Sequence, residues 1–303
     1  MVSILSAFVQ QLLIIGKFKV SALQGKLYRA MLTAAEYLSK ERINLIPELV
    51  ELAKKKPGRL IIDDTSNPKY ANLKGLTRKL FIPSTSGYCN GYRILLFLWE
   101  SSGERFPVAF ALWHKESAPL LELTLEGFSI LRNTAGLKPM SVLGDGAFGT
   151  EEIIKRLTDY GWPCIFRIKN NRKLKGEKIK RLIPRGYGKC STKLDNGVSI
   201  KIIRRKQHFL QCNRMTWETS KIRAEYTKRW AIEEVFRILK SCLNLCGCQQ
   251  HSMPRQALYV LLCCVVLASL EQHPNLSPYA ARNASILGEI NPENLLKPLL
   301  LAA

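Results

Sequence analysis

The sequence predicts a mixed α/β fold, an α+β mixed sheet with helices on its faces. Two observations predict this class. From residue 59 to residue 169, short apolar runs typical of strands alternate with helix-like stretches, in the order strand, hairpin, helix, strand, helix, strand. A basic, β-rich stretch then precedes a charged helix and an apolar helix. The chain of 303 residues, 47% of them hydrophobic, is long enough to bury a large core.

The N-terminal part has the periodicity of a small helical region. Apolar residues repeat at helical spacing until the loop KKKPGR, where Pro57 and Gly58 end the pattern. The predicted organisation has five parts: a short helical N-terminal region (1–57), the first part of the core (58–170), a basic β insertion (171–215), a charged helix with its packing helix (216–272) and a short C-terminal tail (273–303).

The core begins with RLIIDDT (59–65), an apolar, β-branched run that predicts a buried strand ending in two acids. Residues 66–90 are polar and contain Gly and Pro, so we expect an extended loop there. Residues 91–115 predict a β-hairpin, because two apolar arms flank the turn sequence SSGE.

Two helices and two strands complete the first part of the core. A helix over 117–135 precedes a second buried strand over 138–145, which also ends in an acid. The next helix has a cap at Thr150 and a stop at Gly161. A last strand follows over 163–169.

The insertion is the most basic part of the chain. RIKNNRKLKGEKIKR and KIIRRK contain few acids, and a strand pair is expected to turn at Asn196 and Gly197. HFLQCN (208–213) predicts one more strand. Lys and Arg side chains on such strands would bind a DNA backbone independently of its sequence.

The stretch YTKRWAIEEVFRILK predicts the charged helix. At about 100° of rotation per residue, Tyr226, Arg229, Glu233 and Lys240 fall on one stripe of it. Such a stripe suits a metal ion and phosphates. A solvated face with ion pairs would also explain it, because Glu233 can reach Arg237 at i,i+4.

Charge and cysteine content narrow the class of partner. The chain has 46 Lys and Arg against 24 Asp and Glu, a net charge of +22 that indicates a polyanion partner, either nucleic acid or an anionic membrane surface. The nine cysteines have no regular spacing and no signal peptide precedes them, so we expect reduced thiols in the cytosol. The apolar run over 258–270 is too short to span a bilayer and fits a buried helix, so no membrane partner is expected.

Two strands of the predicted sheet end in acids, at Asp64 and Asp145, and Glu233 follows on the charged helix. Sites in α/β sheets gather at the carboxyl ends of strands, so these carboxylates would converge if the two strands are neighbours. Asp63 and Asp64 cannot both face such a site, because neighbouring strand residues point to opposite faces. Three close carboxylates need a cation, and Mg²⁺ prefers oxygen ligands of this kind.

Other clusters have simpler explanations. Strand-end solvation or helix capping would account for either Asp taken alone. Cys242, Cys246, Cys248 and His251 form a cluster, but their spacing is not that of a standard zinc site.

These features together resemble the DDE transposases of bacterial insertion sequences, specifically the insertion-sequence-4 type. The hallmark of that type is a helix that reads Tyr, two residues, Arg, three residues, Glu, six residues, Lys, and residues 226–240 keep this spacing. IIDDTS resembles the strand with the first family Asp, and the Asp directly before Thr, Asp64, is the matching one. VLGDGAFG resembles the strand with the second, Asp145.

The resemblance implies a ribonuclease H-like fold and metal-dependent, cut-and-paste DNA transposition. Asp64, Asp145 and Glu233 would be the catalytic residues and would hold two Mg²⁺ or Mn²⁺ ions. The residues expected to bind DNA phosphates are Tyr226, Arg229 and Lys240. The implied partners are double-stranded DNA, as terminal inverted repeats and target, and a second copy of the chain in a homodimer. The implied location is the bacterial cytoplasm, at the nucleoid.

Two departures from the family pattern leave alternatives open. The N-terminal region is short for the family, and the Trp that usually stacks on a displaced base is replaced by His208 and Phe209, with Trp230 as a further candidate for stacking. The chain could therefore be an idle DNA-binding or dimerising remnant that inhibits a full-length relative. It could also be a ribonuclease H-like nuclease that does not join strands.

Overall fold

The computed structural model describes residues 41–69, 77–82, 86–169, 172–174, 176–184, 186–248, 250–273, 275–287 and 289. Most of the predicted helical N-terminal region, residues 1–40, lies outside the described residues. Its remainder forms the short strand β1 (Asn44–Leu45) and helix α3 (Pro47–Lys54). The predicted C-terminal tail includes helix α10 (Pro278–Ile286).

A mixed sheet of ten strands forms the centre of the described molecule, as predicted, in the order β1-β5-β4-β2-β6-β7-β12-β11-β10 with β3 paired to β4. Its middle strands are β2 (Arg59–Lys69), β4 (Gly87–Ser101), β5 (Glu104–Trp113), β6 (Val142–Gly144) and β7 (Cys164–Ile168). β2 is antiparallel to β4 and parallel to β6, so the strand that carries Asp63 and Asp64 and the strand that precedes Asp145 are neighbours.

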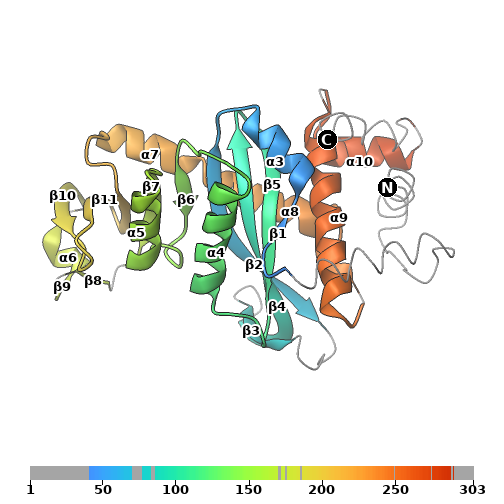
Figure 1. The fold of residues 1–303 in the computed structure, drawn as a ribbon, viewed down its shortest axis with the longest axis horizontal. Helices are drawn as coiled ribbons and strands as arrows, with labels where there is room; N and C mark the ends of the chain where they lie inside the picture. The colour runs from blue at the N-terminus through green and yellow to red at the C-terminus, as the bar shows by residue number, and fades with distance from the viewer. Residues whose placement is uncertain are drawn as a thin grey trace.

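Helices α4 (Leu120–Asn133) and α5 (Glu151–Asp159) cover one face of the sheet, in front of it in Figure 1. Ile62 of β2 stands opposite Phe97 of β4, and the Phe97 ring packs edge-on against Phe128 of α4 with centroids 5.9 Å apart. The even-numbered side chains of β2 therefore face α4, because residues opposite each other in a sheet share a face.

Helices α7 (Thr219–Thr227), α8 (Trp230–Ser241) and α9 (Met253–Glu271) cover the other face, and α7 and α8 run behind the sheet in Figure 1. Arg59 of β2 donates to Glu225 of α7 over 2.6 Å. Asn67 of β2 donates to the Tyr92 hydroxyl over 2.8 Å, and that hydroxyl donates to Gln256 of α9 over 2.5 Å. The odd-numbered side chains of β2 thus face the helices that follow the insertion.

Local turn and cap signals of the core are confirmed. Ser102 and Gly103 form the β4–β5 turn with φ of 51° and 93°, and at Gly103 the absence of a side chain makes this angle free of strain. The Thr150 hydroxyl caps α5 by accepting a hydrogen bond from the Ile153 amide over 3.3 Å. Gly161 follows α5 with φ of 73°.

The prediction of an extended loop over 66–90 is wrong for its described parts. β2 continues to Lys69, β3 spans Arg78–Ile82, and β4 already begins at Gly87. Pro68 is tolerated in β2 because β6 pairs only with the first half of that strand, so the edge at Pro68 needs no amide donor.

The basic insertion has the predicted strands β10 (Tyr187–Lys193), β11 (Ser199–Arg205) and β12 (His208–Cys212). β12 pairs with β7, so these strands continue the central sheet. The small elements β8 (Lys173–Leu174), β9 (Glu177–Lys178) and α6 (Ile179–Leu182) complete the insertion at the left end of Figure 1.

The charged helix is not the single helix that was predicted, because α7 ends at Thr227 and α8 begins at Trp230. The backbone between them keeps helical angles, but its hydrogen bonds join residues three apart. The Arg229 amide donates to the Tyr226 carbonyl over 3.1 Å, for example. Such bonds tighten and end a helix, so Tyr226 belongs to α7 and Glu233 to α8.

Helix α9 includes the apolar run predicted to be a buried helix. Among the described residues it is the one helix long and apolar enough to cross a membrane, yet 78% of its apolar window is buried inside the protein. That burial is typical of a core helix.

Candidate active site

The register between β2 and β6 determines which acid of β2 lies beside Asp145. Leu60 pairs with Val142, Ile61 with Leu143 and Ile62 with Gly144. One further step along both chains sets Asp63 beside Asp145, which directly follows β6. The Asp145 carboxylate also accepts the Ala147 amide over 2.7 Å, which holds the start of the following loop.

Asp63 lies on the sheet face that α7 and α8 cover. Its Oδ2 is 3.1 Å from Nη1 of Arg229, and its Oδ1 accepts the Asp64 amide over 2.8 Å. Burial, followed by the negative charge of Asp145, raises the pKa of Asp63 to about 7 against the opposing effect of Arg229. The Asp63 carboxylate is therefore short of positive charge even with Arg229 beside it.

Asp64 points to the opposite face, as strand alternation requires. Its Oδ2 accepts a hydrogen bond from Nη1 of Arg93 over 2.9 Å, and its side chain is 8% exposed. Burial raises the pKa of Asp64, while Arg93 acts in the other direction and Asp145 has a smaller effect. Asp64 is thus a buried acid with a cation of its own.

Glu233 lies in the first turn of α8 and is joined to the site through Arg229. One nitrogen of the Arg229 guanidinium donates to Glu233 and the other to Asp63. A guanidinium presents such paired donors in a fixed plane, so it can hold two carboxylates at once. The helix of Glu233 and the strand of Asp63 are therefore linked by one cation.

The acids of β2, β6 and α8 have the donor chemistry of a magnesium site, since hard carboxylate oxygens suit Mg²⁺ or Mn²⁺. In the part of the chain that the structure describes, no three His, Cys, Asp or Glu side chains gather closely enough to hold a metal ion. The Arg229 guanidinium lies between Asp63 and Glu233 and provides the positive charge there. A metal ion on these acids would require Arg229 to turn away from at least one of them.

Two further residues of the predicted stripe differ in position. The Tyr226 hydroxyl is half-buried and donates to the Gly144 carbonyl over 3.3 Å, directly beside Asp145. Lys240 is exposed near the end of α8, and its charge favours the ionised form of Asp64. Tyr226 therefore lies beside Asp145, whereas Lys240 lies about three helical turns beyond Arg229 and acts on Asp64.

The prediction that Phe209 stacks on a displaced base is wrong. Its ring is fully buried (0% exposed), with the Arg204 guanidinium 5.0 Å from the ring centroid. His208 is exposed and its Nδ1 is 2.8 Å from Arg167, and Trp230 is 52% exposed. A role for either in base stacking stays a prediction.

The cysteine cluster after α8 has the surroundings of a packing core. Cys242 and Cys248 are buried, and burial raises the pKa of both thiols. Lys69 of β2 donates to the Cys248 carbonyl over 2.8 Å, so a cation already binds the backbone there. A metal held by these thiols finds no support among the described residues.

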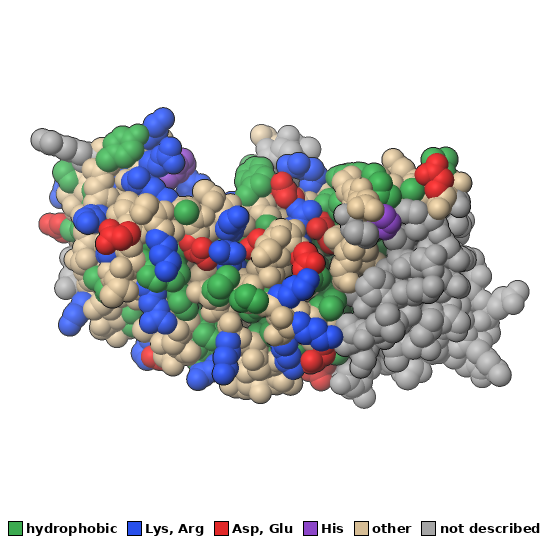
Figure 2. Space-filling model, turned by 90° about the horizontal axis from the view of Figure 1, so that it is seen from above, with side chains coloured by type: hydrophobic (Ala, Val, Ile, Leu, Met, Phe, Trp, Pro, Cys, Tyr) green, Lys and Arg blue, Asp and Glu red, His purple; other side chains and the backbone are tan. Residues whose placement is uncertain are grey.

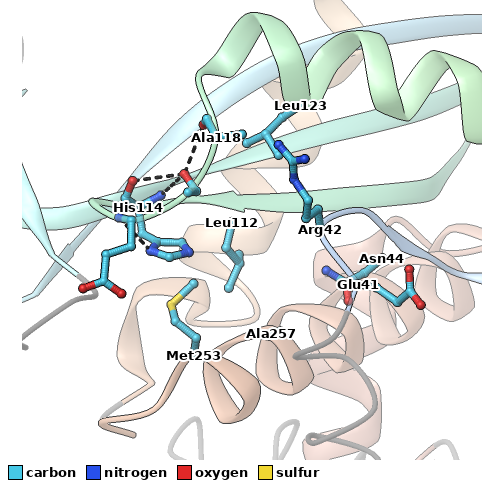
Figure 3. A pocket seen from close by; sticks show the side chains of 11 residues that line it. Glu41, Arg42, Asn44, Leu112, His114, Ala118, Leu123, Met253 and Ala257 are labelled. Carbon is cyan, nitrogen blue, oxygen red and sulfur yellow. Dashed lines mark hydrogen bonds between the residues drawn. The ribbon is translucent and has the colours of Figure 1, made fainter.

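A separate cavity of about 430 Å³ lies at the start of α4 and α9. Figure 3 shows Leu112 of β5 and Met253 and Ala257 of α9 along it, with Arg42 at its edge. The loop that carries His114 closes one side through hydrogen bonds to the Ser117 hydroxyl. This cavity shares no residue with the candidate site.

The family described as a transposase DDE domain matches residues 115–267, just over half of the chain. The chain belongs to the DDE transposase family. The match includes Asp145 and Glu233 and begins after β2, so both acids of that strand lie outside it.

Among solved structures, this DDE transposase is similar to a piggyBac transposase in a synaptic complex with hairpin DNA, with 14% sequence identity and a TM-score of 0.50. The alignment covers 80% of this chain and 52% of the piggyBac chain, so this chain spans about half the length of that relative. The similarity shows the ribonuclease H-like fold that was predicted. Human ENDOV aligns with 71% of this chain and 97% of its own, at 13% identity and a TM-score of 0.32. No curated protein matches the sequence.

Proposed function

We propose that this DDE transposase cuts DNA at the ends of a mobile element and joins the freed 3′ ends to target DNA. The observation that carries the proposal is the arrangement around Arg229, which joins Asp63 of β2 to Glu233 of α8 beside Asp145. Buried acids on adjacent strands are costly unless a cation or a reaction needs them. The family match agrees with a reaction on DNA.

The residues that would hold Mg²⁺ or Mn²⁺, as two ions, are Asp63 or Asp64, Asp145 and Glu233. When bound, the ions would stabilise the attacking and leaving oxygens of a phosphodiester. The protein contributes the positions of the acids, because two come from adjacent strands of one sheet and the third from a helix packed on that sheet.

We favour Asp63 as the β2 acid of this site. Asp63 faces α8, stands in register with Asp145 and shares Arg229 with Glu233. Asp64, which the sequence pattern favours, faces the α4 side and is paired with Arg93. Asp64 therefore remains a prediction from sequence, and geometry supports its neighbour.

Arg229, Tyr226 and Lys240 would bind phosphates of the DNA end. Arg229 suits this role because its guanidinium can exchange carboxylate oxygens for phosphate oxygens with the same paired geometry. Tyr226 would donate its hydroxyl to a phosphate in place of the Gly144 carbonyl. Lys240 would act as a point charge farther along the strand.

DNA cleavage by the purified chain tests this function. The substrate is a duplex that carries the DNA flanking the gene, with a plasmid as target, in Mg²⁺ or Mn²⁺. We expect metal-dependent nicks at the element end and joined products. Glu233→Gln should lower the nicking rate by more than about 100-fold, since even groups that only support a metal ligand cost 10- to 100-fold.

Glu234→Gln is the matched control, because Glu234 is the next residue of α8 and pairs with Arg105 away from the acids. It should cleave as the unmodified chain does. Binding without nicking in either metal would contradict catalysis, and nicking without joined products would support a nuclease in place of a transposase.

A further inference from the structure

A second pocket, of about 290 Å³, lies between the basic strands and α7, next to the candidate active site. Strands β7, β11 and β12 form its floor and the C-terminal half of α7 its wall. The lining residues are Arg167, Ile203, Arg205, His208, Leu210, Arg223, Tyr226, Thr227 and Arg229.

Strand register brings the floor residues together. Leu210 of β12 stands opposite Arg167 of β7 on one side and Ile203 of β11 on the other. His208 stands opposite Arg205, two residues along the same strands. Residues two apart on a strand share a face, so all five point to the side that α7 covers.

The lining is strongly cationic and contains no acid. Arg167, Arg205 and Arg223 form no ion pair with any carboxylate among the described residues. Arginines of the core differ: Arg59, for example, lies between Glu100 and Glu225. Cations held together without acids repel one another unless an anion joins them.

One hydrogen-bond donor in this pocket has no acceptor among the described residues. The Nε of Arg223 is buried and has no hydrogen-bond partner there, while its Nη2 donates only at 3.4 Å to the Arg204 carbonyl. A buried donor without an acceptor is costly, so an acceptor supplied by a ligand would stabilise the folded protein. Figure 2 shows Lys and Arg side chains gathered with a histidine at the left end, beside a hollow in the outline.

The pocket also shares a wall with the acids. Arg229 lines it and pairs with Asp63 and Glu233, and Tyr226 lines it while its hydroxyl reaches the residue before Asp145. A group bound in the pocket is therefore adjacent to whatever lies on the carboxylates.

We propose that this pocket binds a backbone phosphate of the DNA strand that enters the active site, on the far side of Arg229 and Tyr226 from the acids. The proposal rests on the proposed function, and it assigns Arg167, Arg205 and Arg223 as the phosphate ligands. Guanidinium groups bind phosphate through paired hydrogen bonds. The floor beside them is apolar at Ile203 and Leu210, and a phosphate bound over it would be partly shielded from water.

DNA affinity measured without metal tests the pocket. The probe is a fluorescein-labelled 20-base-pair duplex, titrated at several salt concentrations. Arg205→Gln and Arg223→Gln should each weaken binding by about tenfold, the effect of losing a charged hydrogen bond. Each should also lower the slope of log affinity against log salt by about one. Arg205→Lys keeps the charge and should recover most of the slope.

Arg181→Gln is the matched control, because Arg181 is an exposed cation on α6 of the same insertion and does not line the pocket. Its effect should be less than twofold. The assignment would be overturned if the pocket variants melt as the unmodified chain does and yet bind DNA with the same affinity and salt slope as Arg181→Gln. Inorganic phosphate is a second probe, which distinguishes a site for free phosphate from a site for DNA phosphate. If the variants weaken the binding of inorganic phosphate but leave DNA binding unchanged, the assignment to DNA is also overturned.

The outcomes for the pocket and for catalysis can be told apart. DNA binding that depends on the pocket, in a chain that never nicks DNA, would uphold the pocket and contradict catalysis. Metal-dependent nicking with normal rates in both pocket variants would uphold catalysis and contradict the pocket.

Discussion

Arg229 is the side chain on which the charge balance of the candidate site depends. It binds Asp63 and Glu233 at once, and its own side chain is 17% exposed. Without it, a buried acid whose pKa already lies at about 7 would lose its nearest cation. Arg229 therefore stabilises the metal-free protein, and a divalent cation would take over part of that role.

Replacing Arg229 tests whether a divalent cation can take over its stabilising role. Arg229→Gln should lower the free energy of unfolding by about 1–3 kcal/mol in EDTA, below the range for fully buried pairs because Glu233 is partly exposed. Mg²⁺ should then stabilise the variant more than the unmodified chain. Urea unfolding with and without Mg²⁺ measures both effects.

Arg237→Gln provides the control, since Arg237 is an exposed cation on the same helix. A loss for Arg229→Gln no larger than for this control, or an equal response of both proteins to Mg²⁺, would contradict the exchange.

At single residues, the sequence predicts which types of side chain meet but not every orientation. The spacing of Arg229 and Glu233 correctly predicts that they lie together on one side. Alternation predicts that Asp63 and Asp64 face opposite ways, but the face that matters depends on where α8 packs. That packing is a long-range contact, which a local pattern does not contain.

At the scale of elements, periodicity predicts helices and strands well where the chain has a clear apolar face. The hairpin over 91–115, the capped helix α5 and the buried helix α9 agree with the structure. No Gly or Pro lies at the break between α7 and α8, so the sequence pattern predicts one continuous helix there. The polar residues of 66–69 continue β2 because Asn67 and Lys69 find buried partners on distant elements.

The approach of α4 to the sheet depends on a glycine. A Cβ atom at Gly127 would lie 2.1 Å from the ring of Phe97, which is fully buried. Alanine usually favours a helix over glycine by up to about 1 kcal/mol. Overpacking a rigid buried ring costs about 1–3 kcal/mol, so the clash should exceed that gain.

Gly127→Ala should therefore lower the free energy of unfolding by up to about 2 kcal/mol, the clash less the helix gain. Chemical denaturation measures the change. Gly127→Ala combined with Phe97→Leu serves as the control, because a smaller side chain opposite should relieve part of the clash. A Gly127→Ala protein as stable as the unmodified chain would show that α4 does not depend on this close contact.

At the scale of the whole molecule, one sheet joins the acids to the basic strands. The pairing of β7 with β12 places the insertion on the same surface as α7, so the site and the cationic pocket share Arg229 and Tyr226. The sequence predicts the fold class, the basic insertion and its strands. It does not predict that they continue the central sheet, because that pairing joins residues more than forty positions apart.

The net charge of +22 acts at this scale too. Such a charge would favour the approach of the DNA in the proposed function, while the acids of β2, of α8 and of the residue after β6 form a local region of opposite sign. A cation is needed there before a phosphate can approach, since like charges repel. The central claim is therefore that one acid from each of these three elements forms a single metal-dependent site.

The most direct test of this claim compares the two acids of β2. DNA nicking in Mn²⁺ is measured under single-turnover conditions for Asp63→Asn and Asp64→Asn, with folding checked by thermal melting. We predict that Asp63→Asn lowers the nicking rate by more than about 100-fold, as for Glu233→Gln, and that Asp64→Asn lowers it by less than about tenfold. The reverse order, or equal rates for both variants and the unmodified chain, would contradict the site described around Arg229.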